Sequence, residues 1–232
     1  KTEINKKDKS LNLNILQCNK CGLVQLNIRP VSYYKSVITA ASVSGEAKKT
    51  KLKQLKKFCN KFSLKNKKIL EIGSGSGAVL DLIQNSGMKA YGIEYSQKSV
   101  LKGKANKRNI FKGYITDQKK IKNSPYDGFI CFNFIEHIPK LNLFLKTIYE
   151  NLNKKAVGLI TVPNLNYLIK TRSFYEFVPD HLSYFTLDTI KYLFLKNYFK
   201  IIESKLINNN NDILLTVKKN EKKSNFKIKI KP

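Results

Sequence analysis

Three closely spaced glycines and two carboxylates are the residues of this sequence best suited to binding a small molecule. The segment Glu71-Ile72-Gly73-Ser74-Gly75-Ser76-Gly77 places a glycine at every second position, and Glu94 stands 17 residues after Gly77. Glycine lets a backbone turn tightly and approach a ligand closely, and the first N–H groups of a following helix are free to bind it. A carboxylate such as Glu94 can accept hydrogen bonds from both hydroxyls of a ribose. The alternative is a plain tight turn without a ligand.

Strands and helices that alternate along the chain would hold this turn at the edge of a parallel sheet. Apolar runs predict strands over residues 68–72, 90–94, about 110–115, 127–132 and 156–162, and a closing hairpin over 199–207 and 212–217. Apolar spacing and caps predict helices over residues 48–62, 78–86, about 97–108, 141–152 and 186–197. This alternation predicts an α/β fold: a doubly wound, Rossmann-like, seven-stranded sheet, mostly parallel with an antiparallel edge strand, and helices on both faces.

The remaining segments lie outside this alternation. We expect a small N-terminal appendage over residues 1–46, the α/β domain over 47–218 and a Lys-rich tail over 219–232. Apolar residues at 226, 228 and 230 alternate in the tail and would suit a further edge strand.

The chain is strongly basic, since 44 Lys and Arg residues against 16 Asp and Glu residues give a net charge of +28. Only Arg29, Arg108 and Arg172 are arginines, although base-edge and bidentate phosphate recognition favour Arg. The lysines are spread over nearly every segment beside abundant Asn, as in proteins of AT-rich genomes. We interpret the charge as solvated faces that would attract a small anionic metabolite. This pattern argues against a nucleic-acid partner.

Hydropathy and cysteine usage indicate the compartment. No apolar run reaches the ~18–20 residues that a membrane span needs, and no apolar segment near the start is typical of a secretory signal. The cysteines at 18, 21, 59 and 131 show no disulfide framework, which indicates a reducing environment. We therefore expect a cytoplasmic protein without a membrane span, as a monomer or homodimer.

The glycine spacing separates two classes of nucleotide-type cofactor. Dinucleotide-binding proteins have G-x-G-x-x-G, which counts against a nicotinamide-dependent oxidoreductase. The G-x-G-x-G pattern after Glu71 resembles class I S-adenosylmethionine-dependent methyltransferases. The resemblance extends over about residues 48–218. It includes Tyr126-Asp127-Gly128-Phe129-Ile130 and Phe132-Asn133-Phe134-Ile135-Glu136-His137-Ile138, the latter typical of ubiquinone-type small-molecule O-methyltransferases.

This resemblance implies that S-adenosylmethionine is the methyl donor and S-adenosylhomocysteine the product. The cofactor-binding residues that it implies are Glu71, Gly73, Ser74, Gly75, Gly77, Glu94, Tyr95, Ile115, Asp117, Phe132 and Asn133. Asp117 would accept a hydrogen bond from the adenine amino group, and Ile115 would cover the ring; a helix or turn cap is the alternative for Asp117. Ubiquinone-type enzymes can bind a divalent metal at E-x-x-E-H, but Asn133 replaces the first acid here.

Two further segments resemble sugar C-methyltransferases. Asp180-His181-Leu182-Ser183-Tyr184-Phe185-Thr186 is similar to their E-H-x-S-Y-F-S segment, and Cys18-x-x-Cys21-Gly22-Leu23-Val24-Gln25 to the second knuckle of their N-terminal zinc module. Structural zinc takes four ligands, so Cys18 and Cys21 would bind it only with ligands upstream of Lys1; otherwise the site has degenerated into a small hairpin with two free thiols.

The two histidines of the chain lie in these segments. An imidazole with an ordinary pKa of ~6.5 suits proton removal near neutral pH. We predict that His181 is the general base, positioned by Asp180 or Tyr184, and that His137 with Glu136 lines the acceptor pocket. Further predicted acceptor contacts are Tyr33, Tyr34, Arg172 and Tyr175. The alternatives are a loop histidine bonded to backbone, a histidine that merely opens a helix, and an Arg172 in a surface ion pair.

The sequence therefore predicts methyl transfer to a small anionic acceptor. We favour O-methylation of a sugar, a nucleotide-linked sugar or a related building block of capsule or lipopolysaccharide, because Val178 replaces a tyrosine that assists C-methylation. The alternatives are C-methylation of a nucleotide-linked deoxysugar, an RNA methyltransferase and a non-catalytic partner subunit of the same fold.

Overall fold

The computed structural model describes residues 12–31 and 45–222. Tyr33, Tyr34 and the strand expected near residues 226–230 lie outside the described residues.

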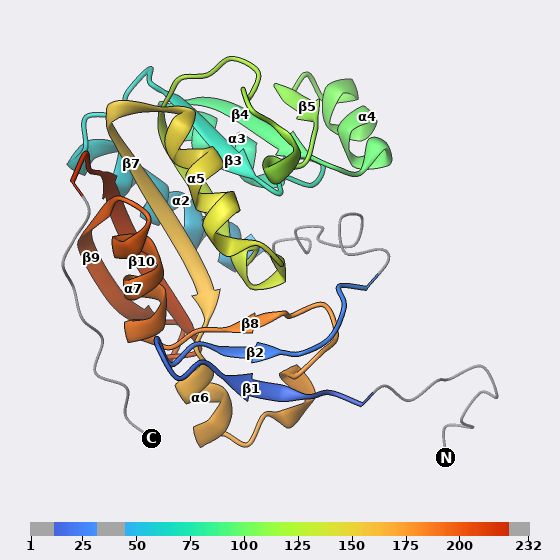
Figure 1. The fold of residues 1–232 in the computed structure, drawn as a ribbon. Coiled ribbons are helices and arrows are strands. Elements are labelled where there is room, and N and C mark those ends of the chain that lie inside the picture. Colours follow the sequence, from blue (N-terminus) through green and yellow to red (C-terminus); the bar gives the residue numbers. More distant parts are fainter. Residues whose placement is uncertain (1–11, 32–44, 223–232) are drawn as a thin grey trace.

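A seven-stranded sheet forms the centre of the molecule (Figure 1). Its spatial order is β5 (Ile110–Lys112), β4 (Lys89–Glu94), β3 (Lys68–Ile72), β6 (Tyr126–Phe132), β7 (Leu152–Pro163), β10 (Asp212–Lys219) and β9 (Phe199–Ile207). The first five strands are parallel, and β10 runs antiparallel to both of its neighbours. The predicted sheet, mostly parallel with an antiparallel hairpin at one edge, is confirmed.

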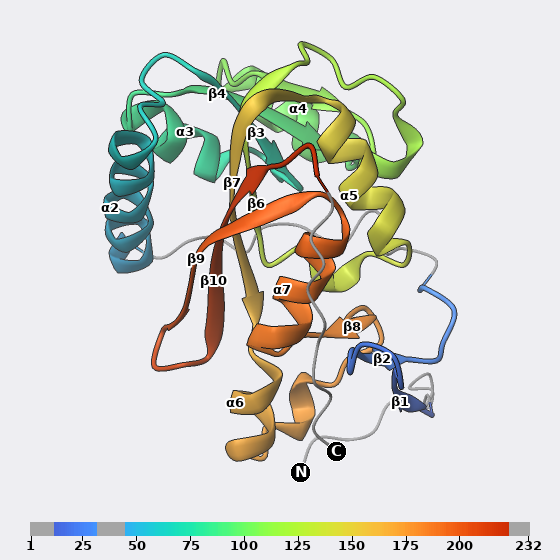
Figure 2. The same ribbon diagram turned by 60° about the vertical axis from the view of Figure 1, so that its left-hand side comes forward.

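Helices cover both faces of the sheet, as Figure 2 shows. One face carries α2 (Gly45–Lys61), α3 (Ala78–Asn85) and α4 (Gln97–Ala105), whose buried side chains share a core that includes Leu55, Ile83 and Val100. The other face carries α5 (Leu141–Glu150) and α7 (Leu187–Lys196), which bury Phe144 and Phe194. Because both faces are covered, the parallel strands are nearly continuous apolar runs.

Several boundaries differ from the predicted ones for local reasons. The strand predicted over 110–115 ends at Lys112, because the chain turns through Gly113 into a short 3-10 helix, η1 (Ile115–Asp117). The helix predicted to reach 108 ends at Ala105, and Lys107 has a φ of 57°, which no helix continues. β7 starts at Leu152, four residues earlier than predicted, where Leu152 pairs with Tyr126.

A second, three-stranded sheet joins the N-terminal segment to the α/β body. β1 (Ile15–Gln17) and β2 (Val24–Leu26) form an antiparallel hairpin, and β2 pairs with β8 (Ser183–Tyr184). In Figure 1 this sheet lies beside α6 (Leu165–Lys170). The sequence did not predict β8, because a two-residue strand has no periodicity of its own. The predicted division at 46/47 and 218/219 stays a prediction.

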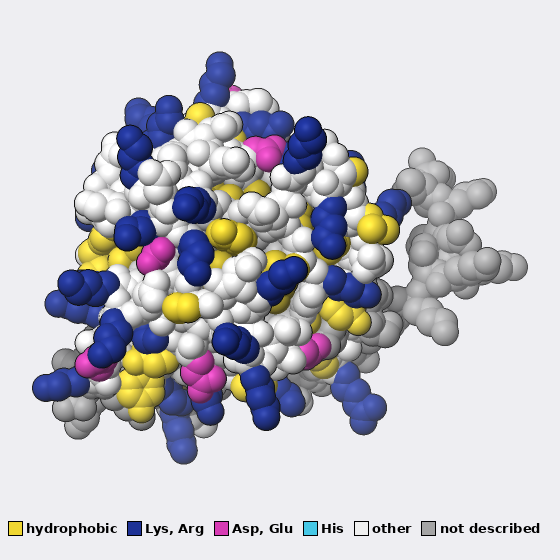
Figure 3. Space-filling view, turned by 90° about the horizontal axis from the view of Figure 1, so that it is seen from above, with side chains coloured by type: hydrophobic (Ala, Val, Ile, Leu, Met, Phe, Trp, Pro, Cys, Tyr) yellow, Lys and Arg dark blue, Asp and Glu magenta, His cyan; other side chains and the backbone are white. Residues whose placement is uncertain are grey.

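The distribution of basic side chains and the length of the helices concern the predicted absence of nucleic-acid and membrane partners. Over the face in Figure 3, Lys and Arg side chains are spread out and separated by uncharged surface, without one continuous basic stripe. Within residues 12–31 and 45–222, no helix has both the length and the apolar character to traverse a bilayer.

Candidate active site

The glycine turn follows β3 directly and leads into α3. Gly73, Gly75 and Gly77 have φ values of 70°, 55° and 92°, in the left-handed region that favours glycine. A Cβ atom on Gly73 would lie 2.2 Å from the Phe134 ring, so a larger residue would displace that ring. The backbone N–H groups of Gly73 and Ser74 both donate to the carbonyl oxygen of Ile93, at 3.1 and 3.2 Å. The turn is therefore held against the end of β4.

Arg108 braces the same turn from the α4–β5 side. Its Nη1 donates to the carbonyl oxygen of Ser76 at 2.7 Å, while Nε and Nη2 donate to the Asp81 carboxylate at 2.8 and 2.5 Å. Asp81 lies in the first turn of α3, so one guanidinium ties the turn to the helix that follows it. The sequence had singled out Arg108 only as one of three arginines.

Glu94, at the end of β4, bonds directly to the glycine turn. Its Oε2 accepts from the Gly75 N–H and its Oε1 from the Ser96 N–H, both at 2.8 Å. The residue is only 3% exposed. Burial raises the pKa of Glu94, and the N–H donors partly offset this by favouring the carboxylate. The two features that the sequence predicted as one site are thus in hydrogen-bond contact.

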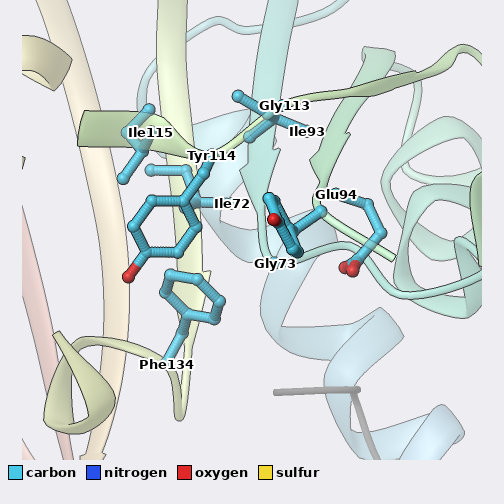
Figure 4. Close-up of a pocket in the computed structure, with 9 residues that line it drawn as sticks. Ile72, Gly73, Ile93, Glu94, Gly113, Tyr114, Ile115 and Phe134 are labelled. Atoms are coloured by element: carbon cyan, nitrogen blue, oxygen red, sulfur yellow. The ribbon is translucent and has the colours of Figure 1, made fainter. Parts of the chain in front are cut away.

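A narrow pocket with apolar walls opens beside Glu94 (Figure 4). In the figure, the Tyr114 and Phe134 rings and the Ile72 and Ile115 side chains lie on one side, with the Glu94 carboxyl group on the other. The full lining is Ile72, Gly73, Ile93, Glu94, Tyr95, Gly113, Tyr114, Ile115 and Phe134. Such a lining suits a flat base with a ribose beside it.

Of the residues that the resemblance implies for cofactor binding, Gly73, Glu94, Tyr95 and Ile115 line this pocket, whereas Asp117 is exposed at the end of η1 and is not part of the lining. A bond from Asp117 to the adenine amino group stays a prediction. The sequence analysis missed Tyr114, which stands next to Ile115, and Phe134, which stands in the quoted segment 132–138.

Glu71 presents a buried carboxyl group with an unsatisfied oxygen. Among the described residues its Oε2 has no hydrogen-bond partner. Burial raises the pKa of Glu71 well above its ordinary value, and the nearby Lys51 ammonium opposes that shift. A cationic ligand group at this oxygen would remove the cost of an unpaired buried acceptor. The ammonium of an amino acid fits this requirement.

Lys51 of α2 carries the charge opposite to that of Glu71, and the sequence analysis missed this residue. Its Nζ lies 4.6 Å from the centre of the Phe132 ring. Burial lowers the pKa of Lys51, while Glu71 and Asp212 raise it. Lys51 and Glu71 both line the same cavity, and as a pair they suit the carboxylate and the ammonium of an amino acid. No local signal could have selected Lys51, because it is one of many lysines in a Lys-rich helix.

A cavity of about 860 Å³ joins these residues to the predicted acceptor site. Its lining includes the predicted residues Glu71, Gly73, Phe132, Asn133, Glu136, His137 and His181, and Glu46, Ala47, Thr50, Lys51 and Gln54 of α2. Asn133 is held by Thr161, whose hydroxyl donates to Asn133 Oδ1 at 2.5 Å. The cavity is large enough for a drug-sized ligand and excludes a folded macromolecule from its interior.

The two histidines meet in this cavity. The centres of the His137 and His181 rings are 4.6 Å apart, with the rings at 73° to one another. His137 Nδ1 lies 2.8 Å from the carbonyl oxygen of Asp180. A carbonyl only accepts, so Nδ1 carries the proton and Nε2 is left as an acceptor. The N–H of Leu182 donates to the carbonyl of Glu136 at 2.8 Å, which fixes the two segments together.

The surroundings of the histidines keep both rings neutral near pH 7. Burial lowers the pKa of His137. Burial and the neighbouring His137 together lower the pKa of His181 to about 4, and Asp180 opposes this only in part. A neutral imidazole has a lone pair that can accept a proton. The arrangement can therefore take a proton from a ligand in the cavity.

Known proteins share both the sequence pattern and the fold of this chain. A family model described as a methyltransferase domain matches residues 45–204. The chain belongs to this methyltransferase family. Among its relatives, the C-methyltransferase NovU of Streptomyces niveus is 24% identical over 203 residues, 82% of this chain and 47% of that protein. The ubiquinone biosynthesis O-methyltransferase of Pelagibacter ubique is 26% identical over 115 residues, 48% of this chain and 47% of that protein.

This methyltransferase therefore spans about half the length of the curated relatives that it matches. Solved structures share its fold. One of them is magnesium protoporphyrin IX methyltransferase of Synechocystis with bound SAH, with a TM-score of 0.59 and 13% identity over 81% of this chain and 96% of that one. The predicted fold class and the predicted membership in a methyltransferase family are confirmed.

The remaining predicted acceptor residues of the methyltransferase occupy different positions. The Tyr184 ring is buried and stacks on Phe177 with centres 4.6 Å apart, and its hydroxyl accepts from the Val178 N–H at 3.2 Å. Tyr184 thus holds the loop before His181 and does not line the cavity. Arg172 is exposed, Tyr175 is 77% exposed, and neither lines the cavity. Their contact with an acceptor stays a prediction.

Two groups of side chains bear on the metal predictions. Ligand atoms of Glu136, His137 and His181 lie within 4.8 Å of one another, a spacing that a divalent ion such as zinc could also use. No other group of three or more such ligands occurs in the part of the chain that the structure describes. Cys18 and Cys21 lie in the turn between β1 and β2 as free thiols. Zinc at this pair stays a prediction that needs ligands outside the described residues.

Proposed function

We propose that the enzyme transfers a methyl group from S-adenosylmethionine to a hydroxyl of a small sugar-type acceptor bound in the large cavity, with His181 as the general base. The observation that carries this proposal is the edge-to-face His137–His181 pair, in the same cavity as the unsatisfied Glu71 carboxyl group. When bound, S-adenosylmethionine supplies a methyl group that its sulfonium already activates.

Different residues around the glycine turn would bind different groups of the cofactor. Glu71 is suited to its ammonium and Lys51 to its carboxylate, because these two opposite charges face one cavity. Glu94 is suited to the ribose hydroxyls, and the Tyr114 and Phe134 rings to the adenine. Holding donor and acceptor in one site supplies most of the rate in such a displacement.

Proton removal would fall to His181. A hydroxyl attacks the methyl group more readily as its proton leaves, and the neutral ring accepts that proton. His137 is a positioning residue in this scheme, because its Nδ1 contact with the Asp180 carbonyl fixes the backbone next to His181. Asp180 was predicted to position His181. The contact of its backbone carbonyl oxygen with His137 supports a positioning role for this residue, through a main-chain atom.

Two observations bear on the class of acceptor. The cavity of about 860 Å³ has the size of a small-molecule site, which favours a small molecule over RNA. The segment Asp180–Thr186 resembles sugar methyltransferases, which supports a sugar or nucleotide-linked sugar used for a surface polysaccharide in the cytoplasm. C-methylation is the second candidate, because NovU matches over 82% of the chain. Val178, which replaces a tyrosine, favours the hydroxyl acceptor.

The test uses S-adenosylmethionine with an isotopically labelled methyl group and a fractionated bacterial extract. We expect label in a small sugar-containing molecule as an acid-stable, base-stable methyl ether, and about 10²- to 10⁴-fold slower labelling by H181A. Label in the RNA fraction, or wild-type labelling rates in H181A, would contradict the proposal. The variant E203Q serves as a control, because Glu203 forms a surface ion pair with Lys61 outside the cavity.

A further inference from the structure

The large cavity has a sign of charge opposite to that of the whole molecule. The chain carries a net charge of +28, yet the cavity is lined by five carboxylic acids: Glu46, Glu71, Glu136, Glu176 and Asp212. Lys51 is the single lysine or arginine in that lining, as far as the structure describes it. Because the chain as a whole is strongly basic, its overall composition does not explain the acidic lining, which is specific to this cavity.

The cofactor accounts for only part of these acids. Glu71 and Lys51 together match the ammonium and the carboxylate of S-adenosylmethionine. The Glu136 carboxyl group remains, and it lies next to the histidines that we assign to the acceptor. Whatever binds beside His181 therefore meets Glu136.

Glu136 lacks a partner for one of its oxygens. The residue is 2% exposed, it lines the cavity, and its Oε2 has no hydrogen-bond partner among the described residues. Its Oε1 lies 4.0 Å from His137 Nε2, and that ring is neutral near pH 7. A buried carboxyl oxygen without a donor is costly until a ligand supplies one.

The charged side chains that act on the Glu136 carboxyl group are acids. Asp212 at the start of β10 and Asp180 in the loop before β8 both act on its carboxyl group electrostatically. Burial, with these two like charges in addition, raises the pKa of Glu136 to about 8. Glu136 and Asp212 both line the cavity, and the Asp180 carboxylate lies 3.7 Å from His137 Nδ1, so a cation bound at Glu136 would be attracted by carboxyl groups from separate elements.

We propose that the acceptor carries a positively charged amino group, as an amino sugar does, and that Glu136, aided by Asp180 and Asp212, binds this ammonium. An ammonium offers three N–H donors, which matches the unpaired oxygen and the surrounding carboxylates. This inference rests on the proposed function, since it names the class of sugar that is methylated. A nucleotide-linked amino sugar joins an anionic nucleotide to a cationic amino group, so it also satisfies the anionic acceptor predicted from the sequence.

The test compares three sugars that differ at one position: glucosamine, glucose and N-acetylglucosamine. Each is titrated into the full chain saturated with S-adenosylhomocysteine, and binding is followed by ligand-observed NMR. We expect glucosamine to bind about tenfold or more tightly than the other two, as a charge-assisted hydrogen bond provides. The isosteric variants E136Q and D212N should each remove most of that preference, while E203Q keeps it.

Equal binding of the three sugars would overturn the inference, as would a preference that survives in both E136Q and D212N. Melting temperatures of the variants and their affinity for S-adenosylhomocysteine show that each variant is folded. The labelled-methyl assay separates this inference from the proposed function. Label in a small sugar without an amino group would overturn the inference alone, whereas absence of any labelled small molecule would overturn the function as well.

Discussion

The His137 and His181 rings meet edge to face with 4.6 Å between their centres, although 43 residues of chain separate them. A short 3-10 helix, η2 (Ile135–His137), presents the first ring, and the loop before β8 presents the second. The Leu182–Glu136 backbone bond keeps these two segments together. Because each ring lies in the surroundings of the other, a change at one histidine should alter proton transfer at the other.

The first prediction concerns the general base. Replacing His181 by Ala should lower kcat by about 10²- to 10⁴-fold, because the attacking hydroxyl loses its proton acceptor. Affinity for S-adenosylhomocysteine should stay within about twofold, measured by calorimetry, because the proposed cofactor contacts lie around the glycine turn. A variant whose turnover and cofactor affinity both match the wild type would remove His181 from the mechanism.

The second prediction is the pH dependence. The pKa of His181 is lowered to about 4, so the neutral, proton-accepting form is present above that value and is lost only as pH falls through it. We expect kcat to be flat between about pH 5.5 and 7.5, where a base of ordinary pKa ~6.5 would already lose activity. In H137N the neighbouring ring is removed, so the pKa of His181 should rise and the acidic limb should move upward. An unchanged limb in H137N would refute the coupling.

Lys51 provides the third prediction. K51M should weaken S-adenosylmethionine binding by about tenfold, because the cofactor carboxylate loses its charge partner. The matched control is K48M, one turn earlier on α2, where Lys48 is exposed and does not line the cavity. Calorimetric titration with S-adenosylmethionine measures both variants. Equal affinity in K51M and K48M would assign Lys51 a packing role against Phe132 only.

The fourth prediction tests the brace at the glycine turn. R108A should lower the free energy of unfolding by about 1 kcal/mol, since the Arg108–Asp81 pair is partly exposed. It should also weaken cofactor binding, because the carbonyl of Ser76 loses its donor. R108K should recover little of either, because Lys lacks the planar fork that reaches Ser76 and Asp81 together. Denaturant unfolding and calorimetry measure the two effects, and R172A at an exposed arginine is the control.

The fifth prediction concerns metal ions. If Glu136, His137 and His181 serve proton transfer, EDTA should leave kcat unchanged, while added Zn²⁺ should inhibit by occupying the two neutral imidazoles and the carboxylate. The assay is best run in a C18S/C21S background, so that the thiols do not bind the ion. Activity that is lost with EDTA and restored by a divalent ion would show instead that the trio holds a metal required for turnover.

Local patterns were sufficient for most of the fold. The apolar runs of β3, β4 and β6 and the glycine turn after β3 could be located closely, because a buried strand and a left-handed turn each restrict residue types. The position of Glu94 at the end of the strand after the turn could be predicted from the order of strand, turn, helix and strand. These features depend on residues that are near one another in the chain.

The rest of the site depends on contacts between distant segments. Lys51 faces Glu71 only because α2 packs across the sheet, and nothing distinguishes it locally from Lys48 or Lys49. Asp212 and Asp180 act on Glu136 only when β10, the loop before β8 and η2 are in place. Charge summed over the sequence pointed to anions, whereas the cavity, within the part of the chain that the structure describes, is lined by five of the chain's 16 acids and a single lysine. Net charge describes the surface and carries no information about an enclosed site.

The pairing of β2 with β8 has a consequence for how the protein is made. Val24 pairs with Tyr184, so the N-terminal hairpin leaves the ribosome long before its partner strand exists. At synthesis rates of about 5–20 residues per second, the free edge of β2 waits on the order of ten seconds. The loop that carries His181 acquires its final support only when this late strand closes onto the early hairpin. A nascent chain of this protein therefore completes the glycine turn well before it completes the loop that carries His181.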